Sequence, residues 1–208
     1  MGMPVLILGE SGSGKSTSLR NFAEDEIGVF NVASKPMPFR RKFRNIVNKP
    51  TYGAIKNGLR KAALKRYVVD DSQYLMAFES FRKAKETGYG KFTDMAVNFE
   101  GLIECAIEET PSDVIVYFLH HIENTDYGRV KAKTLGKMLD NQLTIEGLFS
   151  IVLMTQVDGG NHYFLTQSDG TNPCKTPMEM FDEIRIENDL KMVDETIRKY
   201  YNIQEEEK

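Results

Sequence analysis

The sequence is poor in cysteine and has no long apolar run. Its two cysteines, Cys105 and Cys174, lie far apart without a CxxC or a paired CxxH spacing, which argues against a zinc site and a disulfide framework. We therefore expect two reduced thiols. No stretch of about 18 apolar residues is present, and the opening MGMP leads into an apolar strand without a basic-then-apolar leader. We expect a cytoplasmic protein that spans no membrane.

One long segment lacks acidic residues. Residues 27–69 contain eleven Lys and Arg and no Asp or Glu, although the whole chain has a formal net charge of -3. Residues 70–208 hold 14 basic and 26 acidic side chains, a balance of -12. This division predicts a positive face and a negative remainder. The stretch KPMPFRRKFR at 35–44 is either a surface for a polyanion or a solvated basic loop.

The apolar pattern predicts one α/β domain covering residues 1–208, with a flexible acidic tail at 203–208. Apolar runs of strand length alternate with helix-like stretches, which is typical of a mostly parallel sheet flanked by helices. After residue 156, Gly-Gly and Asp-Gly pairs predict an antiparallel hairpin at the sheet edge. The expected strands are 4–9, 28–33, 66–71, 113–121 and 149–156, and the expected helices are 15–23, 52–65, 72–86, 93–109, 128–148 and 191–201.

Residues 9–17, GESGSGKST, match the phosphate-binding pattern G-x-x-x-x-G-K-[ST]. The match follows an expected strand and opens an expected helix, as this motif requires. Its glycines let backbone N–H groups form a nest for the β-phosphate, Lys15 would bind the β- and γ-phosphates, and Ser16 would bind Mg²⁺. The alternative is a Gly-rich turn with an exposed lysine. The predicted ATP-binding residues are Gly9, Glu10, Ser11, Gly12, Ser13, Gly14, Lys15, Ser16 and Thr17.

Two carboxylates end the strand in KRYVVDD, at the sheet edge where open α/β sheets bind ligands. Asp70 is predicted to hold Mg²⁺ in the Walker B role, and Asp71 to polarise the attacking water. The second expected strand leads into KPMPFRRKF, without a carboxylate, so Asp71 and Glu10 remain as candidates for the base. Alternatively, Asp-Asp-Ser caps the following helix.

DVIVYFLHHIE ends an expected strand in His120 and His121. A polar residue there can touch the γ-phosphate as a sensor, and we favour His121 for that role. The alternative is a surface histidine or a helix cap. A metal site built on the histidines is not expected, because the third one, His162, has no patterned partner.

Several blocks together resemble the phage-encoded RecA-like P-loop ATPases of the AAA type, a group that includes ATP-dependent single-strand annealing recombinases. The resemblance runs from Met3 to about Tyr201 and implies a RecA-like core, with a strand between the P-loop strand and the Walker B strand. It implies Gly14, Lys15 and Ser16 for nucleotide and metal, Asp70 for Walker B, and His121 for the sensor. It also places Lys175 where such proteins present a basic residue to a neighbour's γ-phosphate. The blocks include GESGSGKST, VASKPMPFR, YVVDDSQYL, VYFLHHIENT and KTPMEMF.

RecA-type proteins place two loops near the DNA axis. The first would be the basic segment ENTDYGRVKAKTLGKM. The second would be VDGGNHYFLTQSDG, which carries Tyr163 and Phe164. Basic side chains track phosphates and aromatic rings stack on bases. The loop at 35–44 would make ATP-gated DNA contacts, with Phe39 and Phe43 stacking on bases or anchoring it. The alternatives are a solvated helix face for Lys131–Lys137, a packed hairpin for Tyr163 and Phe164, and a solvated loop for residues 35–44. The candidate DNA contacts are Arg40, Arg41, Lys42, Arg44, Arg129, Lys131, Lys133 and Lys137.

The sequence thus predicts a phage recombination protein that hydrolyses ATP with Mg²⁺, binds single-stranded DNA and promotes strand annealing. The resemblance implies a homo-oligomer, ring or filament, that acts beside a single-strand binding protein in the host cytoplasm. The alternative is a replication-associated, helicase-loading or scaffolding ATPase that acts through a protein partner. A nucleotide kinase is disfavoured, because only Arg185 and Arg198 lie beyond residue 130 to form an Arg-rich lid.

Overall fold

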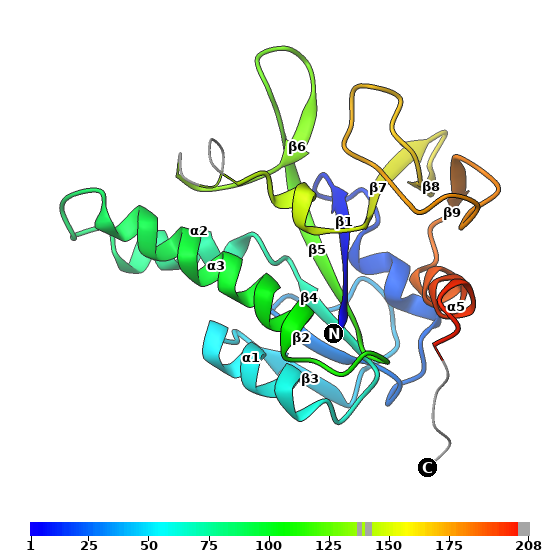
Figure 1. Cartoon of the computed structure of the whole chain (residues 1–208), viewed down its shortest axis with the longest axis horizontal. Helices are drawn as coiled ribbons and strands as arrows, with labels where there is room; N and C mark the ends of the chain where they lie inside the picture. The colour runs from blue at the N-terminus through cyan, green and yellow to red at the C-terminus, as the bar shows by residue number, and fades with distance from the viewer. Residues whose placement is uncertain (137–138, 140–142, 204–208) are drawn as a thin grey trace.

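The chain is organised around one large mixed sheet, seen in a computed structural model that describes residues 1–136, 139 and 143–203 (Figure 1). The predicted DNA contact Lys137 and residues 204–208 of the predicted flexible tail lie outside these residues. Within the described ranges the sheet has nine strands, in the order β3-β2-β4-β5-β1-β7-β8-β9, with β6 paired to β5. The strands are β1 (Met3–Gly9), β2 (Gly28–Asn31), β3 (Asn45–Asn48), β4 (Arg66–Asp70), β5 (Ile115–Asn124), β6 (Val130–Ala132), β7 (Ile151–Asp158), β8 (Asn161–Leu165) and β9 (Arg185–Glu187).

The strands from β3 to β7 in this order are parallel, whereas β6, β8 and β9 pair antiparallel with their neighbours. Strand β5 lies between β1 and β4. The carboxyl ends of β1, β2 and β4 therefore share one edge of the sheet, and the loops that follow them meet there.

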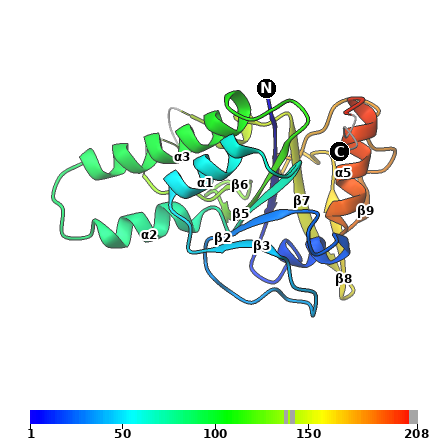
Figure 2. The same cartoon turned by 90° about the horizontal axis from the view of Figure 1, so that it is seen from below.

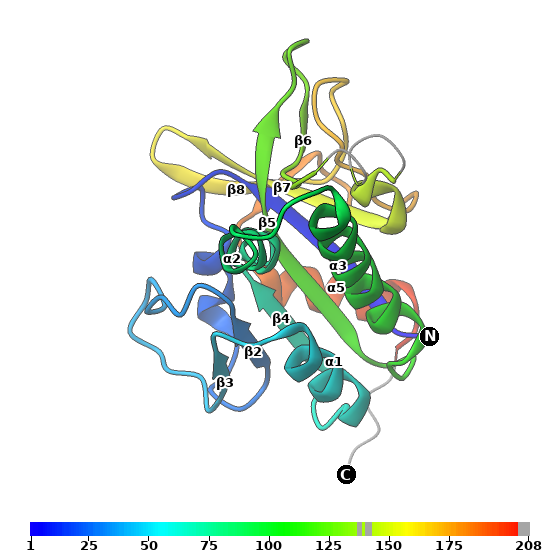
Figure 3. The same ribbon diagram turned by 90° about the vertical axis from the view of Figure 1, so that its left-hand side faces the viewer.

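Helices cover both faces of the sheet, so the central strands are apolar on both sides. Alternate residues of β1 face opposite cores: Leu6 packs in the cluster with α1, α2 and α3, and Ile7 packs in the cluster with α5 and the 3₁₀ helix η1. Figures 2 and 3 show α1, α2 and α3 on one side of the sheet and α5 on the other. The helices are η1 (Ser16–Asn21), α1 (Tyr52–Lys61), α2 (Tyr74–Arg82), α3 (Gly90–Glu108), η2 (Ile145–Leu148, also 3₁₀) and α5 (Leu190–Tyr200).

A buried charge cluster fastens α5 to the sheet. The carboxylate of Asp194, which is fully buried, accepts hydrogen bonds from Arg66 (2.6 Å), Arg198 (2.8 Å) and the hydroxyl of Tyr117 (2.7 Å). Arg198 also donates to the backbone oxygens of Asp113 and Lys65. The charge is thus paired and hydrogen-bonded, as a buried charge must be.

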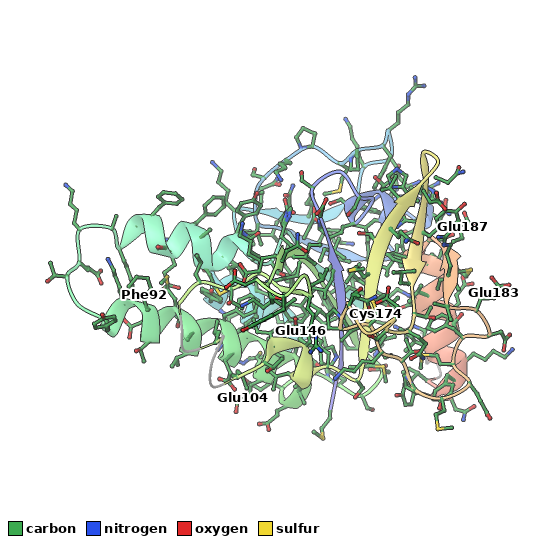
Figure 4. The ribbon with its side chains drawn as sticks, turned by 90° about the horizontal axis from the view of Figure 1, so that it is seen from above. Phe92, Glu104, Glu146, Cys174, Glu183 and Glu187 are labelled. Atoms are coloured by element: carbon green, nitrogen blue, oxygen red, sulfur yellow. The ribbon has the colours of Figure 1, made fainter. Side chains whose placement is uncertain are left out.

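The expected α/β class, the mostly parallel sheet and the C-terminal hairpin are confirmed. The hairpin does not form the sheet edge, because β9 pairs beyond β8. Strand β3 was not expected, since its apolar residues Ile46 and Val47 are flanked by asparagines. Both cysteines are buried free thiols, and Cys174 lies inside the molecule (Figure 4). In the described part of the chain, no helix has the length and apolarity needed to cross a membrane.

Two expected helices are wrong. The helix expected at 15–23 is a six-residue 3₁₀ helix, because Phe22 turns to extended geometry with its side chain fully buried. In the described part of 128–148, the expected helix is interrupted by β6 at Val130–Ala132 and η2 at Ile145–Leu148; residues 137, 138 and 140–142 lie outside the described residues. Gly128 and Gly136 take positive φ angles of 72° and 93°, which break a helix, and the buried carboxylate of Glu146 accepts from the N–H of Ala132.

Candidate functional site

The loop after β1 is shaped by glycine and supported by the C-terminal strands. Gly12 and Gly14 have φ angles of 78° and 105°, which few other residues adopt. The ring of His162, on β8, donates from Nδ1 to the carbonyl oxygen of Ser13 at 2.9 Å. A Cβ on Gly9 would lie 1.8 Å from the hydroxyl of Thr155, on β7. Close packing against Thr155 of β7 thus explains why the loop needs glycine at its start.

Lys15 lies at the base of this loop and is only 5% exposed. Its ammonium donates to the backbone oxygens of Gly9 (2.8 Å) and Glu10 (2.7 Å). Burial lowers the pKa of Lys15 to about 8, against the opposing effect of Asp71 and Asp70. The ammonium is thus a poorly solvated cation, and an anion in the cleft would stabilise its charge.

Ser16 and Asp70 meet across the cleft. The hydroxyl of Ser16 donates to Oδ1 of Asp70 at 2.8 Å, and Asp70 is only 5% exposed. Burial, and after it the neighbouring charge of Asp71, raise the pKa of Asp70 to about 6. A hydroxyl and a carboxylate at this distance fit Mg²⁺, which takes one or two protein oxygens and completes its shell with phosphate and water. The described residues contain no cluster of three His, Cys, Asp or Glu that could hold a metal without such help.

Asp71 is held from two sides. Its Oδ2 lies 2.7 Å from the ammonium of Lys35, and its Oδ1 accepts from Nε2 of His121 at 3.1 Å. Burial acts to raise the pKa of Asp71, but the hydrogen bonds from His121 and Lys35 outweigh it and lower the pKa to about 2. Lys35 also lies 5.1 Å from the ring centre of Tyr74. Asp71 is therefore a weak base in this arrangement, with both carboxylate oxygens occupied.

The two histidines of β5 serve different places. His120 is fully buried, donates from Nε2 to the backbone oxygen of Lys133 and accepts at Nδ1 from the hydroxyl of Ser72, both at 2.8 Å. Burial lowers its pKa to about 4, so the ring is neutral near pH 7. His121 faces the cleft instead. Of the two, only His121 is placed to touch a phosphate.

These side chains enclose a cavity of about 190 Å³ at the carboxyl edge of the sheet. All the predicted ATP-binding residues except Gly9 and Ser13 line it, together with both aspartates and His121. Lys35, Pro36 and Pro38 complete its wall. Sequence reasoning gave Lys35 no role, although it is the first basic residue after β2. The lining residues are Glu10, Ser11, Gly12, Gly14, Lys15, Ser16, Thr17, Lys35, Pro36, Pro38, Asp70, Asp71 and His121.

The basic loop at 35–44 starts in this wall and is anchored by its aromatic residues. Phe43 is buried, Phe39 packs against the same core, and their ring centres lie 5.8 Å apart. Of the two roles considered for these rings, anchoring is the one seen. Arg41 donates to the backbone oxygen of Phe22, and Arg44 pairs with Glu24 at 3.5 Å. The other two predicted contacts on this loop, Arg40 and Lys42, are exposed.

The remaining predicted contacts lie apart from the cleft. Arg129, Lys131 and Lys133 belong to the β5–β6 hairpin, which extends beyond the sheet at the top of Figure 1, so no helix face carries them. Lys131 pairs with Glu123 at 2.9 Å. The exposed Lys175 pairs through its backbone with Val152 and does not line the cleft.

The predicted base-stacking pair is covered. Phe164 is fully buried, so it cannot stack on a base. The guanidinium of Arg185 lies 4.9 Å from the ring centre of Tyr163. The packed hairpin is thus the alternative that holds for these two residues.

A larger groove of about 640 Å³ lies between residues 179–187 and α5 and contains none of the predicted site residues. Its acidic side chains include Glu183 and Glu187, which Figure 4 shows on the side that carries α5. The cleft after β1 is smaller, but it is the place where cations, carboxylates and a histidine converge.

Comparison with known proteins adds no family to this description: no family model and no curated protein matches the chain.

Proposed function

We propose that the protein binds ATP and Mg²⁺ in the cleft after β1 and hydrolyses the γ-phosphate bond. The observation that carries this proposal is the 2.8 Å contact between Ser16 and Asp70, beside the buried ammonium of Lys15. A glycine-shaped loop, a buried lysine, a hydroxyl and a carboxylate are the parts that phosphoryl transfer uses. The position of β5 between β1 and β4 supports the proposal, because it is the strand order that the resemblance to RecA-like ATPases implies.

Each side chain has a distinct task in this proposal. Lys15 releases the loop oxygens of Gly9 and Glu10 and binds the β- and γ-phosphates. Ser16 and Asp70 would hold Mg²⁺, which would supply positive charge to the phosphates. His121 lines the cleft from the end of β5 and is the sensor residue for the γ-phosphate in this proposal.

Hydrolysis requires a water oxygen to bond to the γ-phosphorus while the bond to the bridging oxygen breaks. ADP leaves with that electron pair, and the water's proton passes to a carboxylate or to the phosphate itself. Asp71 and Glu10 are the carboxylates that line the cleft besides Asp70. Because Asp71 has a pKa of about 2 and two occupied oxygens, turnover is expected to be slow until those contacts change.

We propose single-stranded DNA as the partner, with strand annealing in phage recombination as the process. Arg40 and Lys42 are exposed on the loop whose start lines the cleft, so nucleotide binding and DNA contact can influence each other. The protruding β5–β6 hairpin offers a second basic surface. Oligomer formation, Lys175 acting on a neighbour and a single-strand binding protein rest on the resemblance.

A second candidate function is a clamp that holds ATP and recruits a protein partner in replication. The engagement of both oxygens of Asp71 favours it, because a weak base suits holding more than turnover. Tight ATP binding with neither measurable hydrolysis nor DNA stimulation would select this candidate.

The test is nucleotide binding and turnover by wild type, Lys15→Ala and Lys85→Ala, each with and without oligo-dT. Lys85 is exposed in the turn that follows α2, and its replacement serves as a matched control. We expect Lys15→Ala to lose ATP binding and turnover with its fold intact, Lys85→Ala to behave as wild type, and oligo-dT to raise turnover. Unchanged turnover in Lys15→Ala would refute the site.

A further inference from the structure

Among the described residues of the cleft wall, Lys35 is the cation that the proposed function leaves without a task. It lines the cleft from the loop after β2, and its ammonium lies 2.7 Å from Asp71. We propose that Lys35 binds the terminal phosphate of a nucleoside triphosphate, giving up Asp71 as it does so. The inference rests on the proposed function and assigns this residue the recognition of triphosphate over diphosphate.

The backbone at Lys35 is fixed. Asn31, which is 2% exposed at the end of β2, donates to the carbonyl oxygen of Lys35 at 2.7 Å and accepts from its N–H at 3.2 Å. The same amide group of Asn31 donates to Asn48 on β3 at 3.0 Å. The start of the lysine side chain is thus held by the sheet itself.

The side chain beyond this anchor is long and exposed enough to exchange one partner for another. It is 58% exposed, and lysine has four rotatable bonds with three donors at the end. The ammonium is held by the carboxylate of Asp71 and lies 5.1 Å from the ring centre of Tyr74. A fixed backbone with an exposed, flexible cationic side chain is the arrangement needed to bind a phosphate that arrives and leaves.

The charges of the cleft require a cation at this position. Asp71 lies next to Asp70, so a γ-phosphate bound near Ser16 would approach a second carboxylate and be repelled by it. Lys35 forms the ion pair with Asp71, so its ammonium would add a second positive charge to that of Lys15 at this point. The ammonium of Lys35 would neutralise charge on the γ-phosphate, which a diphosphate lacks.

The exchange would also change Asp71. With Lys35 on the phosphate, Oδ2 of Asp71 loses its partner, and Asp71 keeps only the contact of Oδ1 with His121. The freed oxygen can then accept a hydrogen bond from a water molecule facing the γ-phosphorus. Triphosphate binding would thereby release the carboxylate that hydrolysis needs.

The experiment compares the affinity for a non-hydrolysable ATP analogue with that for ADP, both with Mg²⁺, in wild type, Lys35→Met, Lys35→Arg and Lys85→Met. Charge-assisted hydrogen bonds contribute enough that we expect Lys35→Met to weaken binding of the triphosphate by about tenfold or more. ADP affinity should stay within about twofold, Lys35→Arg should recover part of the loss, and Lys85→Met should match wild type.

An unchanged ratio of the two affinities in Lys35→Met would overturn the inference while leaving the ATP site standing. An equal loss for both nucleotides would assign Lys35 a structural role and also overturn it, and thermal melting identifies a variant that fails to fold. If wild type binds neither nucleotide, the proposed function and this inference fall together.

Discussion

The hydroxyl of Ser16 donates a 2.8 Å hydrogen bond to the carboxylate of Asp70, joining the loop after β1 to the end of β4 across the intervening strand β5. The two oxygens come from segments 54 residues apart and meet at one end of a parallel sheet. Because both side chains line the cleft and neither belongs to the apolar core, their contact can be tested without disturbing core packing.

Replacement of Asp70 by Asn should weaken Mg²⁺-dependent ATP binding. The amide keeps the size of the side chain but removes the charge that would hold the cation, so we expect at least about a tenfold loss of affinity with Mg²⁺ and little change without it. Titrating the nucleotide at several Mg²⁺ concentrations measures this difference. Asp182→Asn, at an exposed position, is the control, and equal Mg²⁺ dependence in wild type and both variants would contradict the assignment.

The buried His120 should make the folded protein less stable as the pH falls. Burial lowers its folded-state pKa from 6.5 to about 4, so between these values the unfolded chain binds the proton more readily than the folded protein. This contribution to stability is complete above pH 6.5, declines as the pH falls, and reaches a loss of about 3 kcal/mol near pH 4.

The measurement is denaturant unfolding from about pH 7 to about pH 4.5 for wild type and His120→Gln. The raised pKa of Asp70 acts in the opposite direction, so the difference between the two proteins isolates the histidine. We expect His120→Gln to be less stable near neutral pH and to lose less on acidification. Parallel curves for the two proteins would show that the histidine does not carry this dependence.

Asp194 should be among the most sensitive positions for stability. Its removal leaves Arg66 and Arg198 buried without the carboxylate they share, and breaking a buried pair in this way costs about 3 to 5 kcal/mol. Denaturant unfolding of wild type and Asp194→Ala measures this loss of stability. Glu195→Ala, on the exposed side of the same helix, should change stability by less than about 0.5 kcal/mol. Similar losses in both variants would argue against the cluster.

Arg40 and Lys42 should contribute to DNA binding without affecting basal ATP turnover. Reversing both charges to Glu is expected to weaken oligo-dT binding and to reduce its salt slope by about 0.7 for each phosphate that is no longer neutralised. Fluorescence titration at several salt concentrations gives the slope. Arg41→Glu is expected to lower the melting temperature, because Arg41 bonds to the backbone of Phe22. DNA affinity that ignores Arg40 and Lys42 would remove this loop from the binding surface.

Local pattern predicted the parts of this protein whose structure is determined locally. The apolar runs of β1, β4, β5 and β7 are long enough to indicate strands, and the glycine spacing of residues 9–17 predicted the loop. The convergence of Ser16 and Asp70 followed from the rule that parallel strands share a carboxyl edge. What these predictions have in common is that each depends on the residues of one segment or on the direction of its neighbours.

The errors arose where contacts between distant segments decide the outcome. Residues 128–148 have helix-like spacing, but β6 pairs with the extended end of β5, and Glu146 bonds to the backbone of Ala132. The pairing of Lys35 with Asp71 joins residues 36 positions apart, and nothing in the pattern of either segment indicates it. The burial of Phe164 likewise depends on the partner strands of β8.

The consecutive histidines of β5 hold the segment that follows β4 beside the cleft. Successive side chains of a strand point to opposite faces, so His121 holds Asp71 while His120 holds Ser72, the next residue along. The two residues that follow β4 are thereby each hydrogen-bonded to a histidine of β5, and one of these rings is fully buried. Asp71 and Ser72 are thus both hydrogen-bonded to β5, whereas Lys35 on the cleft wall has a long, exposed side chain. When a ligand binds in the cleft, we expect the side chain of Lys35 to move more than the hydrogen-bonded residues after β4.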